Sequence, residues 1–335
     1  MSNDHNPPTI YDVARLAGVS ITTVSRILNA PEKVNPKTRE RVLTAIDTLG
    51  FVPKAEARAR ALRQTGRIGV LTPFFTAPSF VQRLRGIAAA LANESYELVI
   101  YTVDSSDHLR GYLSTLPLTG NLDGLIIMSL PVGEKETQRL IEHGIQTVFI
   151  EYPHPAVNSV EIDDVQGGRM ATEYLLKKGH QRIAFLGDTD LPEYSIHPVS
   201  QRLVGFRQAL VDAGVEIPEC FIRLAPYTQE QTWLVAKELL ALPERPTAVF
   251  AATDFQAMGV VKAARQLGFR VPEDLAVIGF DDLDLADFFD LTTVRQHLDE
   301  SGRLAVEILL SNIADPTRPP RHIQLQLIIV ERQTT

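Results

Sequence analysis

The sequence predicts an N-terminal all-α helix-turn-helix domain followed, from about residue 66, by a larger α/β region. Residues 9–29 form the pattern of two short helices joined by a tight turn. Beyond residue 66, short apolar strands alternate with helical stretches. The two parts also differ in charge. Residues 1–65 hold ten Lys or Arg and six Asp or Glu, a net +4, whereas the 335-residue chain carries −8, which leaves −12 for the rest.

The first helix has a recognisable start and stop. Thr9 can cap it, and Asp12, three positions later, can reach back to the cap. Gly18 supplies the backbone freedom that a helix end needs. One helical face is expected to be buried and consists of Ile10, Val13, Leu16 and Ala17.

The second helix presents a polar face at its N-terminal end. Ser20 is a natural N-cap. The residues expected to face inward are Val24, Ile27 and Leu28, and those expected to face outward are Ile21, Thr22, Ser25, Arg26 and Asn29. An outward set in this position is what a recognition helix presents to the major groove of DNA. A small helical bundle that binds no nucleic acid is the alternative, and the basic charge of this end favours DNA.

The chemistry of these side chains suits base and phosphate recognition. Arg26 can fork onto a guanine or bind a phosphate, while Thr22 and Ile21 can contact base edges and thymine methyl groups. A third helix is expected to follow, with Asn35 as N-cap, Pro36 in its first turn and Gly50 as its stop. Its buried stripe is expected to be Val42, Ile46 and Leu49.

Long runs of the chain resemble the LacI family of bacterial repressors. The N-terminal runs are TIYDVARLAGVSITTVSRILN at 9–29 and VNPKTRERVLTAIDTLGFVP at 34–53. The later runs are DGLII (123–127), KKGHQRIAFLGD (177–188), RLVGF (202–206), ATDFQAMG (252–259), VPEDLAVIGFDD (271–282) and LTTVRQ (291–296). The resemblance implies a DNA-binding domain joined by a hinge helix to a two-lobed, periplasmic-binding-protein-like (type I) sensor domain.

The segment expected to be the hinge departs from the family pattern. In the family, a leucine seven residues after the proline enters the minor groove and kinks the duplex. Here that position is Arg60, and Leu62 lies nine residues after Pro53. Two extra helical positions rotate a side chain by roughly 200°. We expect Leu62 to be the wedge; the alternative is that it packs between paired hinge helices. The full predicted DNA-binding set is Thr9, Ser20, Ile21, Thr22, Thr23, Ser25, Arg26, Asn29, Ala57, Arg58 and Leu62.

The α/β region is expected to form two lobes. Candidate strands are 67–72, 97–103, 124–128, 146–150, 182–187, 221–225, 247–251 and 275–280; candidate helices include 80–93, 134–143, 165–178, 200–213, 229–241 and 255–267. A single large Rossmann domain is the rival architecture, but no GxGxxG follows a strand. The family resemblance implies crossings between lobes near 163–166, 292–297 and 322–326. The expected domains are 1–53 (DNA-binding), 54–65 (hinge) and 66–335 (ligand-binding core). Within the core, we expect an N-lobe of about 66–164 and 296–323, and a C-lobe of about 165–292 and 325–335.

Residues just after strands are the candidates for a ligand site, because ligands of parallel sheets bind beyond the carboxyl ends of the strands. The resemblance implies that Arg202 hydrogen-bonds ligand hydroxyls. Carboxylates at strand ends can each accept two hydroxyl hydrogen bonds, and aromatic faces can stack on a sugar ring or a purine. The predicted ligand-binding set is Phe74, Phe75, Phe80, Ser129, Glu151, Arg202, Tyr227, Asp254 and Asp281.

Several of these residues have a structural alternative. Asp254 can cap the helix that starts at Phe255, and either Phe74 or Phe75 can belong to the core. Asp282 and Trp233 are expected to be structural, and His143 and His180 to be surface or capping residues.

The composition restricts the classes of protein that fit. There is no apolar run that could span a bilayer, no N-terminal signal pattern, no short repeat, and no metal-site spacing. A single cysteine, Cys220, excludes an internal disulfide framework and fits a reducing cytoplasm. We therefore expect a cytoplasmic protein without cofactors and, since the chain ends ERQTT with no leucine heptads, a homodimer.

Together these observations predict a DNA-binding transcriptional regulator, a repressor whose operator affinity is set by a small effector, most simply a sugar. Its partners would be a near-palindromic operator, the effector and a second copy, with no membrane. One alternative is a corepressor-type regulator that senses a purine or a phosphorylated metabolite. A solute-binding protein is a more distant alternative. An enzyme is disfavoured because GxSxG, GxxxxGK[ST] and HExxH are all absent.

Overall fold

The computed structural model describes residues 8–29, 34–49, 51, 65–189 and 192–335. The chain separates into two compact units, Met1–Thr65 and Gly66–Thr335. The predicted hinge contacts Ala57, Arg58 and Leu62 therefore lie outside the described residues, and so does Arg60.

The described residues of the first unit form three helices, α1 (Ile10–Ala17), α2 (Ile21–Asn29) and α3 (Pro36–Leu49). The carboxylate of Asp12 accepts hydrogen bonds from the Thr9 backbone nitrogen (2.9 Å) and hydroxyl (2.6 Å). Gly18 ends α1 at a φ of 64°, where a side chain would be strained. The Ser20 hydroxyl accepts from the Thr23 backbone nitrogen at 3.1 Å and so caps α2. The expected caps of both helices are present.

The core of this unit joins all three helices and includes Val13, Val24 and Val42, each fully buried. The prediction for Leu16 was wrong, because its side chain is 53% exposed. The buried stripe of α1 instead runs through Ile10, Val13, Ala14 and Ala17. These positions follow the i, i+3, i+4, i+7 spacing of one helical face, and Leu16 falls beside that face.

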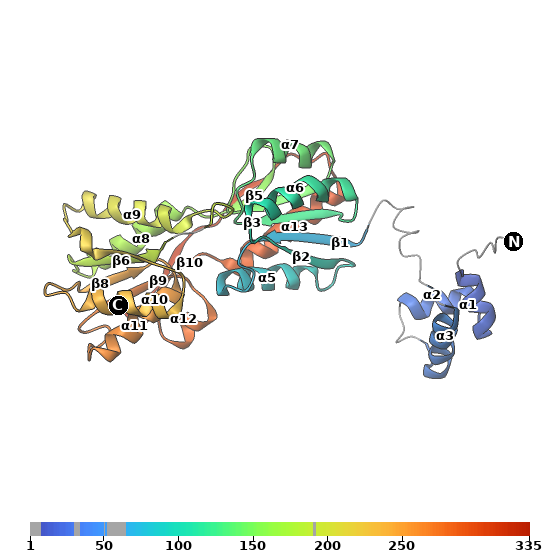
Figure 1. The fold of residues 1–335 in the computed structure, drawn as a ribbon, viewed down its shortest axis with the longest axis horizontal. Helices are drawn as coiled ribbons and strands as arrows, with labels where there is room; N and C mark the ends of the chain where they lie inside the picture. The colour runs from blue at the N-terminus through green and yellow to red at the C-terminus, as the bar shows by residue number, and fades with distance from the viewer. Residues whose placement is uncertain (1–7, 30–33, 50, 52–64, 190–191) are drawn as a thin grey trace. The chain divides into compact units, whose positions relative to one another are not determined.

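The second unit consists of two α/β lobes (Figure 1). The N-lobe is the sheet of order β11-β5-β4-β3-β1-β2 with the helices packed on it. Its elements are β1 (Arg67–Thr72), α5 (Pro78–Leu91), β2 (Glu97–Thr102), α6 (Ser106–Thr119), β3 (Gly124–Met128), α7 (Glu134–Glu142), β4 (Gln146–Ile150), β5 (Asn158–Glu161), α13 (Leu298–Ala314) and β11 (His322–Gln324).

The C-lobe is the sheet of order β12-β10-β9-β8-β6-β7 with its own helices. Its elements are α8 (Asp164–Lys177), β6 (Ile183–Asp188), α9 (Pro198–Asp212), the 3₁₀ helix η2 (Glu219–Phe221), β7 (Ile222–Ala225), α10 (Gln229–Leu240), β8 (Ala248–Ala251), α11 (Asp254–Gln266), β9 (Ala276–Asp281), α12 (Asp284–Phe288), β10 (Thr292–Arg295) and β12 (Ile328–Val330).

The strand pairs are parallel in both sheets, except that β12 is antiparallel to β10. The chain passes between the sheets three times: after β5, after β10 and after β11. Helices cover both faces of each sheet, with α5 and α13 opposite α6 and α7 in the N-lobe. In the C-lobe, α8 and α9 lie opposite α10 and α11. The carboxyl ends of most strands of both lobes consequently face one interlobe region.

The paired helices carry a short repeat, so the expectation that the chain has no short repeat was wrong. Gln-Arg-Leu-x-Gly occurs at 82–86 in α5 and at 201–205 in α9. In each case the glycine lies against the backbone of a partner helix. A Cβ at Gly86 would be 1.9 Å from the Asp299 carbonyl oxygen, and a Cβ at Gly205 would be 1.9 Å from that of Val165. The close helix pairing fixes α5 and α9, and with them the arginine of each motif, relative to their sheets.

Candidate functional site

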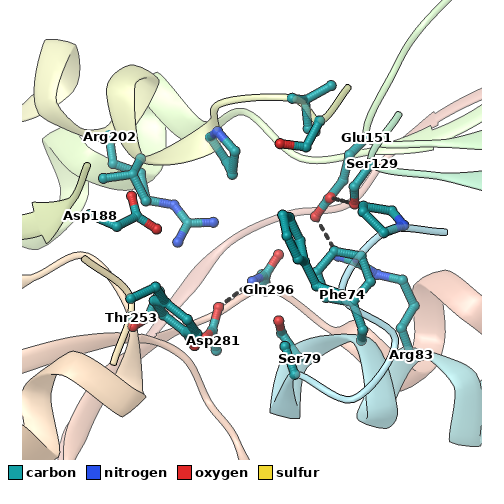
Figure 2. A pocket seen from close by; sticks show the side chains of 18 of the residues that line it. Phe74, Ser79, Arg83, Ser129, Glu151, Asp188, Arg202, Thr253, Asp281 and Gln296 are labelled. Carbon is teal, nitrogen blue, oxygen red and sulfur yellow. Dashed lines mark hydrogen bonds and ion pairs between the residues drawn. The ribbon is translucent and has the colours of Figure 1, made fainter. Parts of the chain in front are cut away.

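A cavity of about 390 Å³ lies between the two lobes (Figure 2). Residues of both lobes form its walls, and many of them directly follow strands. The lining residues are Pro73, Phe74, Thr76, Ala77, Ser79, Phe80, Arg83, Ser129, Glu151, Asp188, Ser195, Ile196, Pro198, Val199, Arg202, Tyr227, Thr253, Asp281 and Gln296. Of the predicted ligand-binding set, seven residues are brought together here: Phe74, Phe80, Ser129, Glu151, Arg202, Tyr227 and Asp281.

Four lining residues have a positive φ although none is glycine. The values are 41° at Phe74, 53° at Ser129, 66° at Glu151 and 128° at Asp281. Ser129 and Glu151 directly follow β3 and β4, and Asp281 is the last residue of β9. Such conformations cost of order 1–3 kcal/mol each and cluster at ligand sites, where they aim a side chain. The strain turns these side chains into the cavity.

The N-lobe wall contains a buried charge pair. Arg83 of α5 is only 3% exposed, and its Nη2 donates to Glu151 Oε1. The Arg83 Nε donates to the Ser301 hydroxyl at 3.0 Å. The second Glu151 oxygen accepts from the Ser129 hydroxyl. Burial acts to raise the pKa of Glu151, but Arg83 and Ser129 outweigh it and lower the pKa, so this carboxylate stays ionised.

The C-lobe wall holds a second buried arginine at the equivalent position of the repeat. Arg202 is 3% exposed, and its Nε donates to Asp164 Oδ1 at 2.8 Å. Its Nη1 donates to the Ala252 carbonyl oxygen at 2.6 Å. The guanidinium lies 3.6 Å from the centre of the Phe280 ring, within range of a cation–π interaction. Three partners therefore fix the direction of this arginine toward the cavity.

Two lining side chains have a buried acceptor atom without a hydrogen-bond partner among the described residues. They are Asp188 Oδ1, at the end of β6, and Gln296 Oε1, on the segment that crosses between lobes. The Nε2 of Gln296 is engaged, because it donates to Asp281 Oδ1. Buried polar atoms are seldom left unpaired, so both acceptors are candidates for a hydrogen bond from a bound molecule.

Burial also shifts the pKa values of two other lining residues, Asp281 and Tyr227. Burial is the largest cause that raises the pKa of Asp281 to about 8, with a further rise from Asp254, although Arg202 opposes it. Burial likewise raises the pKa of Tyr227, which keeps its hydroxyl protonated. At neutral pH the Tyr227 hydroxyl can therefore donate a hydrogen bond, and burial shifts the Asp281 carboxyl toward its protonated form.

Aromatic rings complete the cavity. Phe74 and Phe80 lie edge to face with their centroids 6.1 Å apart, and Tyr227 lies 5.0 Å from Phe255. Phe74 also lies 6.3 Å from Tyr194, which belongs to the C-lobe loop before α9. In the same loop, the Ile196 backbone nitrogen donates to the Ser129 carbonyl oxygen at 3.2 Å. These contacts join the two lobes at the edge of the cavity.

A second interlobe contact is ionic. Arg85 of α5 binds Asp284 of α12 through Nη1 (2.5 Å) and Nη2 (3.2 Å). It also binds Asp299 of α13, in its own lobe, through Nε at 3.0 Å and Nη2 at 2.9 Å. The lobes are thus linked at two separate places in this arrangement.

The other two residues of the predicted ligand-binding set do not line the cavity. Phe75 is 42% exposed and lies outside it. Asp254 is completely buried, and both of its oxygens are occupied by Thr293 Oγ1 and the Leu283 backbone nitrogen. The helix-capping alternative for Asp254 was also wrong, because Thr253 is the N-cap of α11 and accepts from the Gln256 backbone nitrogen. Asp282 pairs with Arg295 and Arg332, which is the structural role expected for it.

Seven lining residues with polar side chains were missed: Thr76, Ser79, Arg83, Asp188, Ser195, Thr253 and Gln296. Arg83 gave a signal, since it is a charged residue on the same helical stripe as the apolar Phe80, Ile87 and Leu91. Asp188 directly continues the strand IAFLG, the position that was used to select Ser129 and Glu151. Gln296 gave no local signal, because it lies on the crossing segment after β10.

The first unit presents the predicted recognition helix to solvent. Ile21, Thr22 and Arg26 are exposed on α2, whereas Thr23 and Ser25 are half-buried. Thr9 and Ser20 are exposed cap residues, and Asn29 ends the helix. Of the three inward predictions for α2, Val24 and Ile27 are buried. The predicted DNA-contacting side chains that the structure describes therefore occupy one helix and its N-cap, together with Thr9 at the start of α1.

The described ranges contain neither a candidate metal site nor a candidate membrane-spanning helix. Across residues 8–29, 34–49, 51, 65–189 and 192–335, no cluster of three His, Cys, Asp or Glu side chains could hold a metal ion. Within the same ranges, no helix combines the length and apolar character needed to cross a membrane.

Comparison with known proteins relates both units to one class. Residues 9–54 match the family described as "Bacterial regulatory proteins, lacI family", and residues 172–335 match a "Periplasmic binding protein-like domain". The ribose operon repressor of Escherichia coli (strain K12) is 35% identical, over 97% of this chain and 98% of its own. The HTH-type transcriptional repressor PurR of Vibrio parahaemolyticus is 34% identical, over 97% of this chain and 98% of its own. The crystal structure of the lac repressor dimer bound to operator and an anti-inducer superimposes with a TM-score of 0.74 at 27% identity, covering 98% of this chain and 99% of that one.

A helix-turn-helix unit followed by a two-lobed α/β unit with a polar cavity between the lobes defines a DNA-binding transcriptional regulator with a small-molecule site. The relatives compared above are transcriptional repressors. The chain belongs to the LacI family of bacterial regulatory proteins.

Proposed function

We propose that the protein is a repressor whose operator affinity is controlled by a neutral sugar bound in the interlobe cavity. The observation that carries this proposal is the charge arrangement of the cavity. Both of its lining arginines are already bound by carboxylates of the protein, whereas two buried acceptors, Asp188 Oδ1 and Gln296 Oε1, have no partner in the described chain. A ligand rich in hydroxyl groups supplies the missing donors without adding charge.

The volume and the aromatic walls support the same ligand class. About 390 Å³ is at the small end of the range for ligand pockets. The ring of Phe74 offers a flat apolar surface for the C–H face of a sugar. The name of the Escherichia coli relative makes D-ribose the first compound to test. We propose that Arg202 and Asp281 of the C-lobe and Gln296 of the crossing segment contact the ligand from one side. Ser129 and Glu151 of the N-lobe would contact it from the other.

Control of the operator follows from the position of the cavity between the lobes. A ligand that contacts both lobes stabilises one of their arrangements over others, and only that difference in affinity can shift the equilibrium. The coupling between sugar and operator is reciprocal, so a sugar that weakens operator binding is itself bound more weakly by the operator complex.

The DNA end is assigned to Thr9, Ser20, Ile21, Thr22, Thr23, Ser25, Arg26 and Asn29, with Ala57, Arg58 and Leu62 of the hinge. We propose that two copies bind a near-palindromic operator, because the symmetry of a dimer must match that of its site. The domain limits proposed above, 1–53, 54–65 and 66–335, apply here. The protein would act in the cytoplasm, where the DNA is, and without a catalytic step.

The test is a thermal-shift screen against neutral sugars, sugar phosphates and purines, since a ligand of the folded state raises the melting temperature. An operator is selected in parallel from random DNA. The expected result is stabilisation by a neutral sugar, with release of the selected operator by the same sugar. Stabilisation by a purine or a phosphosugar that strengthens operator binding contradicts the proposal and favours the corepressor type of control.

A further inference from the structure

We infer that Asp188 sets the ligand specificity of the cavity by admitting a hydroxyl group and rejecting an anion. The inference rests on the proposed function in one respect only, namely that the interlobe cavity is the effector site. Asp188 ends β6 on the C-lobe wall, next to Arg202 (Figure 2).

The two side chains form an acceptor and a donor side by side. Asp188 Oδ1 is buried without a partner in the described chain. The Nε of Arg202 donates to Asp164, and its Nη1 donates to the Ala252 carbonyl oxygen. Its Nη2 donates no hydrogen bond to the described residues. Both side chains are directed into the cavity in Figure 2. A hydroxyl group is donor and acceptor at once, so it can donate to Asp188 and accept from Arg202.

An anionic group cannot satisfy both partners. A phosphate at neutral pH is mainly an acceptor, and its charge would be repelled by the Asp188 carboxylate at short range in a partly dehydrated site. The cations that line the cavity do not compensate. Arg83 is neutralised by Glu151 and Arg202 by Asp164, so a bound phosphate would meet no uncommitted positive charge among the described lining residues.

The environment of Asp188 agrees with this geometry. Burial raises the pKa of its carboxyl, although Arg202 and His197 act in the opposite direction. A carboxylate that is already destabilised by lost hydration gains most from a donor and loses most from a second anion.

The test compares matched pairs of ligands by isothermal titration calorimetry with the full chain. The pairs are D-ribose and D-ribose 5-phosphate, D-glucose and D-glucose 6-phosphate, and inosine and inosine 5′-monophosphate. The variants are Asp188→Asn, which keeps the shape and removes the charge, and Asp188→Ser, which shortens the side chain. Glu216→Gln, on the exposed surface of the same lobe, removes one charge away from the cavity and is the control.

The wild type and Glu216→Gln are expected to bind the neutral member of one pair and to bind its phosphate at least a hundredfold more weakly. Loss of a hydrogen bond to a charged group in Asp188→Asn should weaken the neutral ligand about tenfold to a hundredfold. In both Asp188 variants, the ratio of the dissociation constant of the phosphate to that of the neutral ligand should fall at least tenfold. A circular dichroism spectrum and a melting temperature without ligand that match the wild type show that the variants are folded.

The other outcomes decide against the role of Asp188, against the sugar proposal, or against both. Equal binding of a phosphate by the wild type, or an unchanged preference in both Asp188 variants, overturns the role of Asp188. Binding of inosine with exclusion of its monophosphate overturns the sugar proposal but supports the selection by Asp188. Absence of binding across all three pairs contradicts the sugar proposal and the inference together.

Discussion

At the scale of single residues, the cavity is governed by which charges are already paired. Arg83 and Arg202 occupy equivalent positions of the Gln-Arg-Leu-x-Gly repeat, and each is held by a carboxylate of its own lobe. Breaking a buried pair of this kind typically costs about 3–5 kcal/mol because it leaves an isolated charge. The two arginines therefore act as fixed donors rather than as free cations.

Asp281 should make stability depend on pH. Its pKa is raised to about 8 in the folded protein, against about 3.9 in an unfolded chain. Between these values the folded state holds a proton that the unfolded state has lost. The free energy of unfolding should therefore fall as pH rises from about 4 to about 8, by up to about 1.4 kcal/mol per pH unit. Asp281→Asn should flatten this part of the curve, measured by urea unfolding at a series of pH values.

Asp274→Asn is the matched control for this experiment. The hydrogen bond from Arg270 lowers the pKa of Asp274, so its contribution is lost as pH falls through the acidic range. The slope above pH 5 should be the same in Asp274→Asn and in the wild type. An equal slope in Asp281→Asn and the wild type would contradict the assignment of the slope to Asp281.

Arg26 should determine operator recognition without affecting the ligand. It is exposed on α2 and belongs to a unit separate from the cavity. Arg26→Ala should weaken binding to the selected operator about tenfold to a hundredfold, the value of a bidentate contact to a base, with unchanged sugar affinity. Fluorescence anisotropy with the operator and with scrambled DNA measures the discrimination. Arg41→Ala removes an exposed arginine of α3 and should reduce the preference for operator over scrambled DNA by less than Arg26→Ala does. An equal reduction in both variants would mean that Arg26 contributes only its charge.

At the scale of elements, the helix pairs α5–α13 and α8–α9 depend on close backbone contact at glycine. Gly302 of α13 faces the Arg83 carbonyl oxygen, where a Cβ would lie 2.2 Å away, and Gly168 of α8 faces that of Arg202 at 2.0 Å. Each arginine that lines the cavity is therefore directly positioned by the helix pair that carries it.

Gly205→Ala should destabilise the C-lobe. The added methyl group would lie 1.9 Å from the Val165 carbonyl oxygen, and backbone atoms cannot move aside without separating α8 from α9. Overpacking of this kind costs about 1–3 kcal/mol. Gly111→Ala in α6 is the control: a Cβ there meets nothing within 4 Å, so it should stabilise by about 0.5–1 kcal/mol. Urea unfolding measures both, and equal stability of the two variants would contradict the close-packing argument.

The elements also show how far the sequence predicts the structure. The expected bounds of β1, β3 and β4 agree with the structure, because each is a short run of apolar residues. The strands β5 (NSVE) and β10 (TTVR) were not predicted. They have four residues each and a polar composition, so only their pairing with neighbouring strands identifies them.

The cavity was predictable to the extent that its residues follow apolar strands. Ser129, Glu151 and Asp281 satisfy that rule and line the cavity. Asp254 also follows an apolar strand but does not line the cavity, because its carboxylate is bound by Leu283 and Thr293. These partners lie 29 and 39 residues away in sequence, so the pattern around Asp254 does not reveal them. Arg83 could have been found from its place on the buried stripe of α5, whereas the position of Gln296 depends on the path of the crossing segment and has no local signal.

At the scale of the whole molecule, the contacts between the lobes link the cavity to the arrangement of the core. Ser129 takes part twice, since its hydroxyl donates to Glu151 and its carbonyl oxygen accepts from Ile196 of the other lobe. A ligand that moves Ser129 or Phe74 must therefore also alter an interlobe contact. This connection gives the proposed control of the operator a physical basis, because both lobes respond to one occupant.

A two-fold dimer requires a self-complementary face, and we propose that α12 with the groove beside it is that face. Phe288 is 79% exposed and Phe289 is 47% exposed. The adjacent groove, about 480 Å³, is lined by Gln229, Phe255, Met258, Gly259, Val261, Lys262, Arg265, Gln266, Leu285, Phe289, Leu291 and Thr334. Asp287 flanks the exposed rings, whereas Lys262 and Arg265 line the groove. In a two-fold pair, the exposed ring and the acidic residue of one copy can meet the groove and the basic residues of the other, and the reverse contact forms at the same time.

Phe288→Asp should therefore convert the dimer into a monomer, because it places a charge where an apolar ring would be buried. The same change should weaken operator binding more than tenfold, since one recognition helix then binds one half-site. Val211→Asp is the control: Val211 is 76% exposed but lies on α9, on the opposite face of the C-lobe sheet. Sedimentation velocity at micromolar concentration measures the assembly. If Phe288→Asp remained dimeric while Val211→Asp became monomeric, the self-pairing face would have to be sought on α9 rather than on α12.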